Sequence, residues 1–172
     1  KYNEVKNNYA KTGDLKWLVR DPSPNDPSYR AKAARLIQVY GPLIKAYGIR
    51  DHTIIDELSN TLFSDSFDFS FDEFTLRKFR EWARTRYKDL AELNDAYGSS
   101  FQTWNEVRPS TFAEAQERGK YAGWADHRRV MELSLMDYFE FIRAELRKLD
   151  PEAKISLSGT QHAHPYNGHD IW

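Results

Sequence analysis

Apolar and polar residues alternate at helical spacing along most of the chain. In several stretches the apolar positions recur every three to four residues, which is the period of a helix that buries one face. Capping residues, prolines and glycines mark the ends of these stretches. The predicted helices cover about residues 27–47, 72–87, 90–97, 111–118 and 124–149. Gly41 and Pro42 fall inside the first of them, where a kink or a break into two helices is expected.

Two short segments with β-branched residues each follow a helix. HTIIDE, residues 52–57, comes after a helix that ends at Gly48, and KISLSG, residues 154–159, comes after the long helix. Both segments are predicted to be strands, the first of them buried and ending in the carboxylates of Asp56 and Glu57. A third stretch, KWLVR at residues 16–20, is predicted to be a strand or the edge of a loop.

This order of elements is the alternation of a parallel α/β fold that is rich in helix. Two or three strands cannot close an eight-stranded barrel. We therefore expect either part of a larger (β/α)₈ TIM barrel or a trimmed version of one. The first residues, KYNEVKNNYAKTGD, contain neither a starting Met nor a signal peptide, so the chain looks cut from a longer protein.

Composition excludes several classes of function. Lys and Arg number 25 against 26 acidic residues, so the net charge of −1 supplies no basic field for binding nucleic acid. The absence of cysteine excludes disulfides, thiolate metal sites and cysteine nucleophiles, but it leaves the cellular compartment open. No apolar run reaches the roughly 18 to 20 residues that a membrane span needs.

The end of the first predicted strand is where catalysis is expected. In parallel α/β folds the carboxyl ends of the strands carry the active site. A glycosidase needs a carboxylic acid of raised pKa beside the leaving oxygen, and Glu57 next to Asp56 is a candidate for it. The alternative is that Asp56, Glu57 and Leu58 are an ordinary helix start after a strand.

Two longer segments resemble a known family. FTLRKFREWARTRYKDLAELNDAYGSSFQTWNEV and WADHRRVMELSLMDYFEFIRAELRKLDPEAKISLSG are similar to the β-galactosidase-like enzymes of glycoside hydrolase family 42, and the resemblance runs from about residue 54 to 172. It implies that residues 1–172 are part of one TIM-barrel catalytic domain, around barrel strands 4 and 5. It also implies a retaining hydrolase without a cofactor, in which the intact protein forms a homo-oligomer.

The resemblance also assigns residues. Glu57 matches the family's general acid/base, and Asp56 stands where the family usually has the Asn beside it. With Asp56 in place of Asn, the sugar hydroxyl next to the scissile bond would be held differently from the usual family pattern. The nucleophile would lie on a later strand outside this chain, so the isolated chain is expected to be inactive.

Further candidates suit sugar recognition, in which flat sugar faces stack on rings and hydroxyls meet polar side chains. Arg20 and the aromatic platforms Trp104 and Trp124 are such candidates, although Arg20 could instead form a surface ion pair. The loop at residues 160–170 adds Gln161, His162, His164, Tyr166, Asn167 and Asp170. Its alternatives are an ordinary polar loop, or a metal site at its histidines with Asp170. No metal is expected, because the spacing matches no standard zinc arrangement.

Three functions remain open on these grounds. The first is a glycosidase that cleaves a β-galactoside-like or related bond with a carbohydrate substrate as its partner, without nucleic acid or membrane. The second is a catalytically lapsed barrel that binds carbohydrate, suggested by Asp56 in place of Asn. The third is a helical interaction module in which the carboxylates and loop histidines are incidental.

Overall fold

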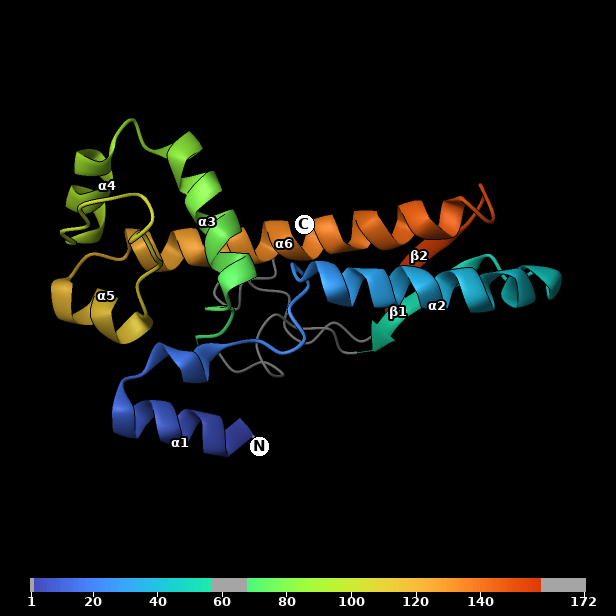
Figure 1. Cartoon of the computed structure of the whole chain (residues 1–172), viewed down its shortest axis with the longest axis horizontal. Helices are drawn as coiled ribbons and strands as arrows, with labels where there is room; N and C mark the ends of the chain where they lie inside the picture. The colour runs from blue at the N-terminus through green and yellow to red at the C-terminus, as the bar shows by residue number, and fades with distance from the viewer. Residues whose placement is uncertain (1, 57–67, 159–172) are drawn as a thin grey trace.

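The structure is a computed structural model that describes residues 2–56 and 68–158. Its elements are shown in Figure 1. In chain order they are α1 (Tyr2–Thr12), the 3-10 helix η1 (Leu15–Leu18), α2 (Pro27–Ala46), β1 (Asp51–Asp56), α3 (Glu73–Arg86), α4 (Leu90–Tyr97), α5 (Phe112–Arg118), α6 (Ala122–Arg147) and β2 (Lys154–Ser158).

The five predicted helices and the two main strands are confirmed. The helix ends could be predicted because they depend on local capping residues. Asp72 begins α3 by accepting the Thr75 N–H, and Thr111 begins α5 with a reciprocal capping box to Glu114. Gly98 ends α4 in the left-handed conformation at φ 63°. Such signals lie within a few residues of each helix end, so the sequence alone reveals them.

Of the two alternatives for residues 16–20, a strand or the edge of a loop, the strand is wrong: a 3-10 turn leads here into irregular chain. Asp14 accepts the Lys16 N–H and starts the 3-10 turn η1, and the chain becomes extended at Val19. A strand is stable when it pairs with another one, and in the described part of the chain the sheet contains β1 and β2 alone. The β-branched and aromatic residues of this stretch therefore pack in a turn, with Leu18 fully buried.

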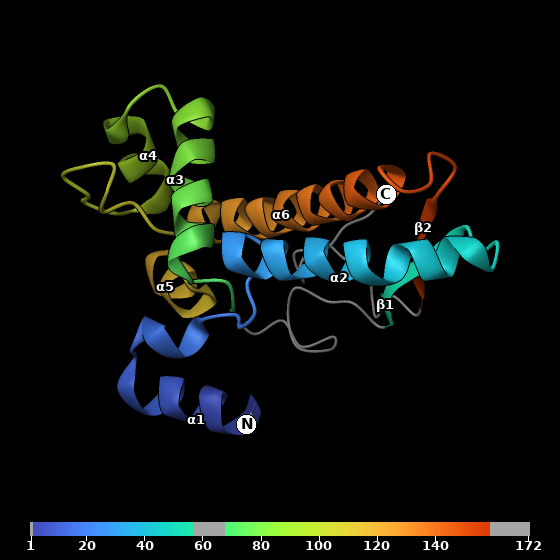
Figure 2. The same cartoon turned by 45° about the vertical axis from the view of Figure 1, so that its right-hand side comes forward.

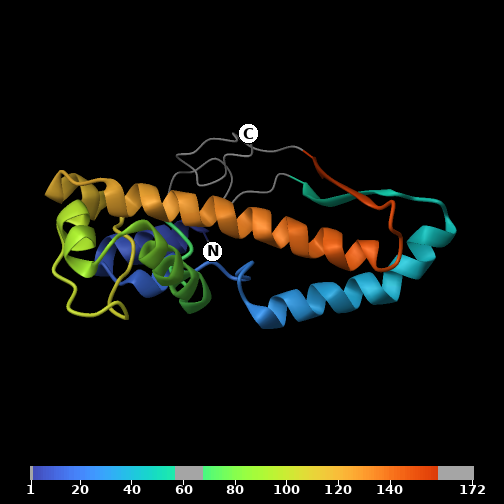
Figure 3. The same cartoon turned by 90° about the horizontal axis from the view of Figure 1, so that it is seen from above.

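Helix α2 runs through Gly41 and Pro42 as one element, so the predicted break is absent. Its axis changes direction toward the C-terminal end, as Figure 3 shows. Proline lacks the N–H that would bond one turn back, which makes it a usual cause of such a bend. Gly41 is buried against Leu149, where an added Cβ would clash with Leu149 Cδ1.

Strands β1 and β2 form a parallel pair. Asp51 lies opposite Lys154 and Thr53 opposite Ser156, whereas the next partners are Asp56 and Ser158. The first strand thus contains one extra residue, a bulge just before its C-terminal end.

The described side chains of the first strand do not meet the expectation of burial, while those of Ile54, Ile55 and Asp56 lie outside what the structure describes. Asp51 and Thr53 are exposed, and side chains of β2 alternate between exposed and half-buried. In Figure 3 helix α6 lies between α2 and the strand pair, and it contacts both α2 and β2. Within the described residues no second layer covers the other face, so alternate side chains stay in water.

Helix α6 joins two hydrophobic clusters. Its first half packs with α3 and α4 around Phe79, Leu93, Tyr97 and Val130. Its second half packs with α2 and β2, where Tyr138, Ile142, Leu146 and Ala153 are buried. Figures 1 and 2 show the resulting shape, with α3 to α5 at one end of α6 and the strands at the other. Trp82 and Tyr138 belong to these clusters, as their helical spacing predicts.

Candidate functional site

The carboxyl ends of the two strands meet at one edge of the sheet. Because the pair is parallel and Asp56 lies opposite Ser158, the chain leaves both strands at the same place. Glu57 follows Asp56 directly, and the predicted substrate loop begins two residues after Ser158. Both predicted parts of the site therefore start from neighbouring backbone positions, as expected for a parallel α/β site.

Most of the predicted site residues lie outside the described residues. The backbone of Asp56 is described as the last residue of β1, while Arg20 and Trp124 are described with their side chains. Those that lie outside are Glu57, Gln161, His162, His164, Tyr166, Asn167 and Asp170. For these seven residues the assigned roles stay predictions.

Arg20 lies just after η1 with its Nε shielded from solvent. Burial lowers the pKa of this guanidinium, and the charges of Tyr29 and Asp72 act in the opposite direction. Arginine stays protonated at working pH, so Arg20 places a half-buried positive charge close to Asp72 at the start of α3. The residue as a whole is half-buried, and both its predicted role in sugar binding and the alternative of an ion pair stay predictions.

Asp68 is a buried acceptor where the described chain resumes after β1. One carboxylate oxygen accepts from Arg128 Nη2 at 2.8 Å and from Trp124 Nε1 at 3.2 Å. The other oxygen accepts the backbone N–H of Phe112 at 2.8 Å. This carboxylate therefore ties the segment before α3 to α6 and to the start of α5.

Trp124 takes part in this network. Its indole N–H is donated to Asp68, the Arg128 guanidinium lies 4.8 Å from its ring centroid, and Phe112 packs edge-on at 5.4 Å. Such contacts hold the indole in place by its polar edge and by a cation–π interaction. Trp104, the other aromatic candidate, packs against the first cluster with Arg84 at 5.4 Å from its ring.

The segment that enters α3 is also fixed by His127. This residue is fully buried, and its Nε2–H donates to the Ser70 carbonyl at 3.4 Å. Ser70 has φ 66°, a left-handed conformation that costs a non-glycine residue free energy. Burial, and then the charge of Arg128, lower the pKa of His127 to about 3, so its ring is neutral.

The sequence analysis missed Asp68, Arg128 and His127. One signal was present, because Arg128 lies in the stripe of α6 that also contains Trp124 and Leu135. A charged residue inside an apolar stripe indicates a buried partner of opposite charge. The partner itself is 60 residues away in the chain, which no local pattern identifies.

The described residues contain neither a metal-binding cluster nor a membrane-spanning helix. Among residues 2–56 and 68–158 no three His, Asp or Glu side chains gather closely enough to hold a metal ion. The histidines and Asp170 that suggested a metal lie outside these residues. No helix in the described part of the chain is both long and apolar enough to cross a membrane.

Comparison with solved structures shows the same fold. An exo-carrageenase of glycoside hydrolase family 42 from Bacteroides ovatus superposes with a TM-score of 0.71 at 20% identity, over 87% of this chain and 21% of that one. A β-galactosidase from Bacillus circulans sp. alkalophilus superposes with a TM-score of 0.57 at 23% identity, over 77% of this chain and 20% of that one. The chain thus forms a helix-rich α/β part, with two parallel strands, of structures about four times its length.

Sequence comparison gives the family. The β-galactosidase bgaB of Geobacillus kaustophilus is 28% identical over 98 residues, which are 52% of this chain and 14% of that protein. The family model described as β-galactosidase of glycoside hydrolase family 42 matches residues 1–172, the whole of the chain. This chain therefore belongs to glycoside hydrolase family 42, the β-galactosidase family.

Proposed function

We propose that the protein containing this chain is a retaining glycosidase that cleaves a β-galactoside-like or related glycosidic bond, with Glu57 as its general acid/base. The observation that carries the proposal is the pairing of Asp56 with Ser158 at the end of a parallel strand pair. Because of this pairing, the predicted acid Glu57 and the predicted substrate loop both come just after strand ends at the same edge of the sheet. Membership of a glycosidase family supplies the class of reaction and a carbohydrate substrate.

The proposed chemistry needs two carboxylates. Glu57 gives its proton to the leaving oxygen while a nucleophilic carboxylate attacks the sugar carbon from the opposite face. In the second step Glu57 takes a proton from water, and that water releases the sugar from the nucleophile. Retaining enzymes hold the two groups about 5 to 5.5 Å apart, so the nucleophile must come from another strand of the same domain.

We propose that this domain is a (β/α)₈ barrel in which β1 and β2 are strands 4 and 5. Two observations support this. In the described residues β1 pairs on one side alone, with β2. Helix α2 also carries a stripe of large apolar side chains, each more than half exposed, at Leu36, Val39, Tyr40 and Leu43. A strand and helix that precede this segment in a barrel would cover both surfaces.

The experiment is hydrolysis of a panel of aryl glycosides, aryl β-galactosides first, by the intact protein and its Glu57→Gln variant. Carrageenan oligosaccharides belong in the panel because a structural neighbour is an exo-carrageenase. We expect the variant to lose several orders of magnitude in kcat/KM, with less loss for leaving groups that need no protonation. The matched control is Glu81→Gln, at an exposed position on α3.

Two outcomes would contradict the proposal. If Glu57→Gln behaves as the parent does, Glu57 is not the acid/base. If the intact protein cleaves no member of the panel yet still binds sugars, the catalytically lapsed barrel is the better explanation. In that case the variant Asp56→Asn, which restores the usual family residue, is tested on the same panel. Activity gained by this variant would indicate a lapsed site, and continued inactivity would indicate a different substrate.

A further inference from the structure

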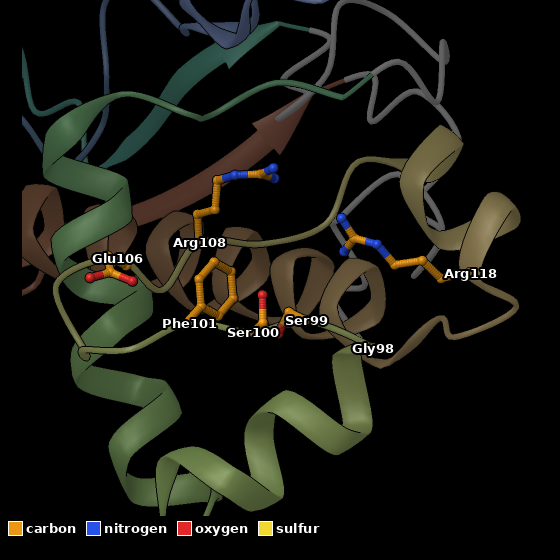
Figure 4. Close-up of a pocket in the computed structure, with 7 residues that line it drawn as sticks. All are labelled: Gly98, Ser99, Ser100, Phe101, Glu106, Arg108 and Arg118. Carbon is orange, nitrogen blue, oxygen red and sulfur yellow. The ribbon is translucent and has the colours of Figure 1, made fainter.

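A groove of about 490 Å³ opens between the C-terminal end of α4, the following loop and α5. Figure 4 shows the residues that line it. Three small residues at 98–100 leave it open, and the ring of Phe101 forms part of its wall. Glu106, Arg108 and Arg118 supply its charges. The groove lies within the α3–α5 segment, between β1 and α6 in the chain, and contains none of the residues predicted for catalysis.

One of the two arginines has its charge satisfied. Arg108 forms a two-pronged pair with Glu114, with Nη–Oε distances of 2.5 and 2.8 Å. Glu114 also accepts the Thr111 N–H at 2.9 Å. Burial acts to raise the pKa of Glu114, but these donors hold it at about 2. The Glu114 carboxylate is therefore charged and already occupied.

Arg118 is left with donors to spare. Its Nη2 lies 3.5 Å from Glu114, too long for a strong hydrogen bond, and it makes no other polar contact to the described residues. A guanidinium has five N–H groups, so most of its donors face the groove or water. The stem of Arg118 packs over Gly98, where a Cβ would lie 3.6 Å from its Cδ. This packing keeps the stem at the rim of the groove.

Glu106, the acidic residue that lines the groove, has its carboxylate bonded within its own turn. Glu106 accepts the Gln102 N–H at 2.8 Å and the Thr103 hydroxyl at 3.1 Å, so its oxygens serve its own turn. In Figure 4 it lies on the other side of the Phe101 ring from Arg118. The half of the groove between Phe101 and Arg118 thus combines an aromatic ring with an available cation.

We propose that this groove binds a sugar that carries an anionic group, with Arg118 pairing with the oxyanion and Phe101 contacting the apolar face of the ring. A carboxylate and a sulfate ester each present at least two terminal oxygens that share the negative charge. A guanidinium can donate to two such oxygens at once. The sugar part of this inference rests on the proposed function. The anion part rests on Arg118 alone.

The test is a calorimetric or NMR titration of the intact protein with probes that contain no glycosidic bond, so that binding is measured without hydrolysis. The probes are galacturonate, galactose 6-sulfate, galactose and inorganic sulfate. We expect the two anionic sugars to bind more tightly than galactose or sulfate alone. Arg118→Gln should weaken them about tenfold or more, the usual scale for a charge-assisted pair. Arg143→Gln, at an exposed ion pair on α6, is the matched control and should change nothing.

Each other result overturns part of the proposal. Sulfate that binds as well as the anionic sugars would mean an anion site without sugar recognition. If Arg118→Gln keeps the unfolding midpoint of the wild type and binds the anionic sugars with unchanged affinity, these sugars do not bind in the groove. Hydrolysis of an aryl β-galactoside by the wild type tests the catalytic function independently, so the two proposals fail separately.

Discussion

Arg128 donates to Asp68 across 2.8 Å, and 4% and 8% of the two side chains remain exposed. Burying such a pair is costly unless both members are well bonded, and here each has further partners. The Asp68 carboxylate also accepts from Trp124 and from the Phe112 backbone. The pair thus holds the segment just before α3 against α6.

Removing one member should be strongly destabilising. We expect Arg128→Met to lower the free energy of unfolding by about 3 to 5 kcal/mol, because Asp68 is left as a buried charge without its cation. Urea denaturation of the intact protein measures this. Arg143→Met, at an exposed pair with Glu140, is the control and should cost less than about 1 kcal/mol. Similar losses for the two variants would show that the buried pair adds little.

Asp126 accepts two phenol groups on the same oxygen, Tyr87 at 2.6 Å and Tyr97 at 2.7 Å. Burial first, and then the charge of Asp126, raise the pKa of Tyr97 far above its usual range, so the phenol stays a donor. Tyr97→Phe should cost about 1.5 to 3 kcal/mol, the scale of hydrogen bonds to a charged group. A double-mutant cycle with Asp126→Ala should show coupling of at least about 0.5 kcal/mol, and additive losses would contradict the bond.

Gly123 leaves room for its neighbours at the start of α6. A Cβ there would come within 2.7 Å of Ser110 Oγ and 2.9 Å of Tyr97 Cδ2. The Tyr97 ring is fully buried and cannot move aside freely. Gly123→Ala should therefore destabilise by about 1 to 3 kcal/mol, although alanine is the better helix former. Ala125→Ser, on the exposed face of the same helix, should stay within about 0.5 kcal/mol, and equal behaviour of the two variants would contradict the clash.

His127 should make the protein sensitive to mild acid. Its pKa is about 3 when folded and 6.5 when unfolded, so below pH 6.5 the unfolded state binds a proton that the folded state excludes. Stability should fall by up to about 1.4 kcal/mol per pH unit as the pH drops from 6.5 toward 3. The window from pH 6.5 to 5 lies above the lowered pKa of Glu114, whose contribution is lost further down.

The measurement is the unfolding midpoint of wild type and His127→Leu at several pH values in that window. The variant should show a smaller slope with pH, whatever its absolute stability. A slope equal to that of the wild type would assign the acid sensitivity to other groups.

Local signals made much of the fold predictable. Asp72, Asp89 and Thr111 each accept an N–H from a residue two or three positions into their own helix, and Gly98 ends α4 with its own backbone. Such contacts depend on neighbouring residues, so the sequence contains them in full. Residues 16–20 show the limit, because their β-forming composition found no strand partner and the Asp14 cap produced a turn instead.

The candidate site divides in the same way. By its own residues and its resemblance to glycoside hydrolase family 42, the sequence determined the family, the order of helices and strands from residue 27 onward, and Glu57 as the candidate acid. Tertiary structure decided that Asp56 pairs with Ser158, that Asp68 holds Arg128 and Trp124, and that Arg118 faces a groove beside Phe101. The reason is physical, since these contacts join residues far apart in the chain and form once helix packing has brought them together.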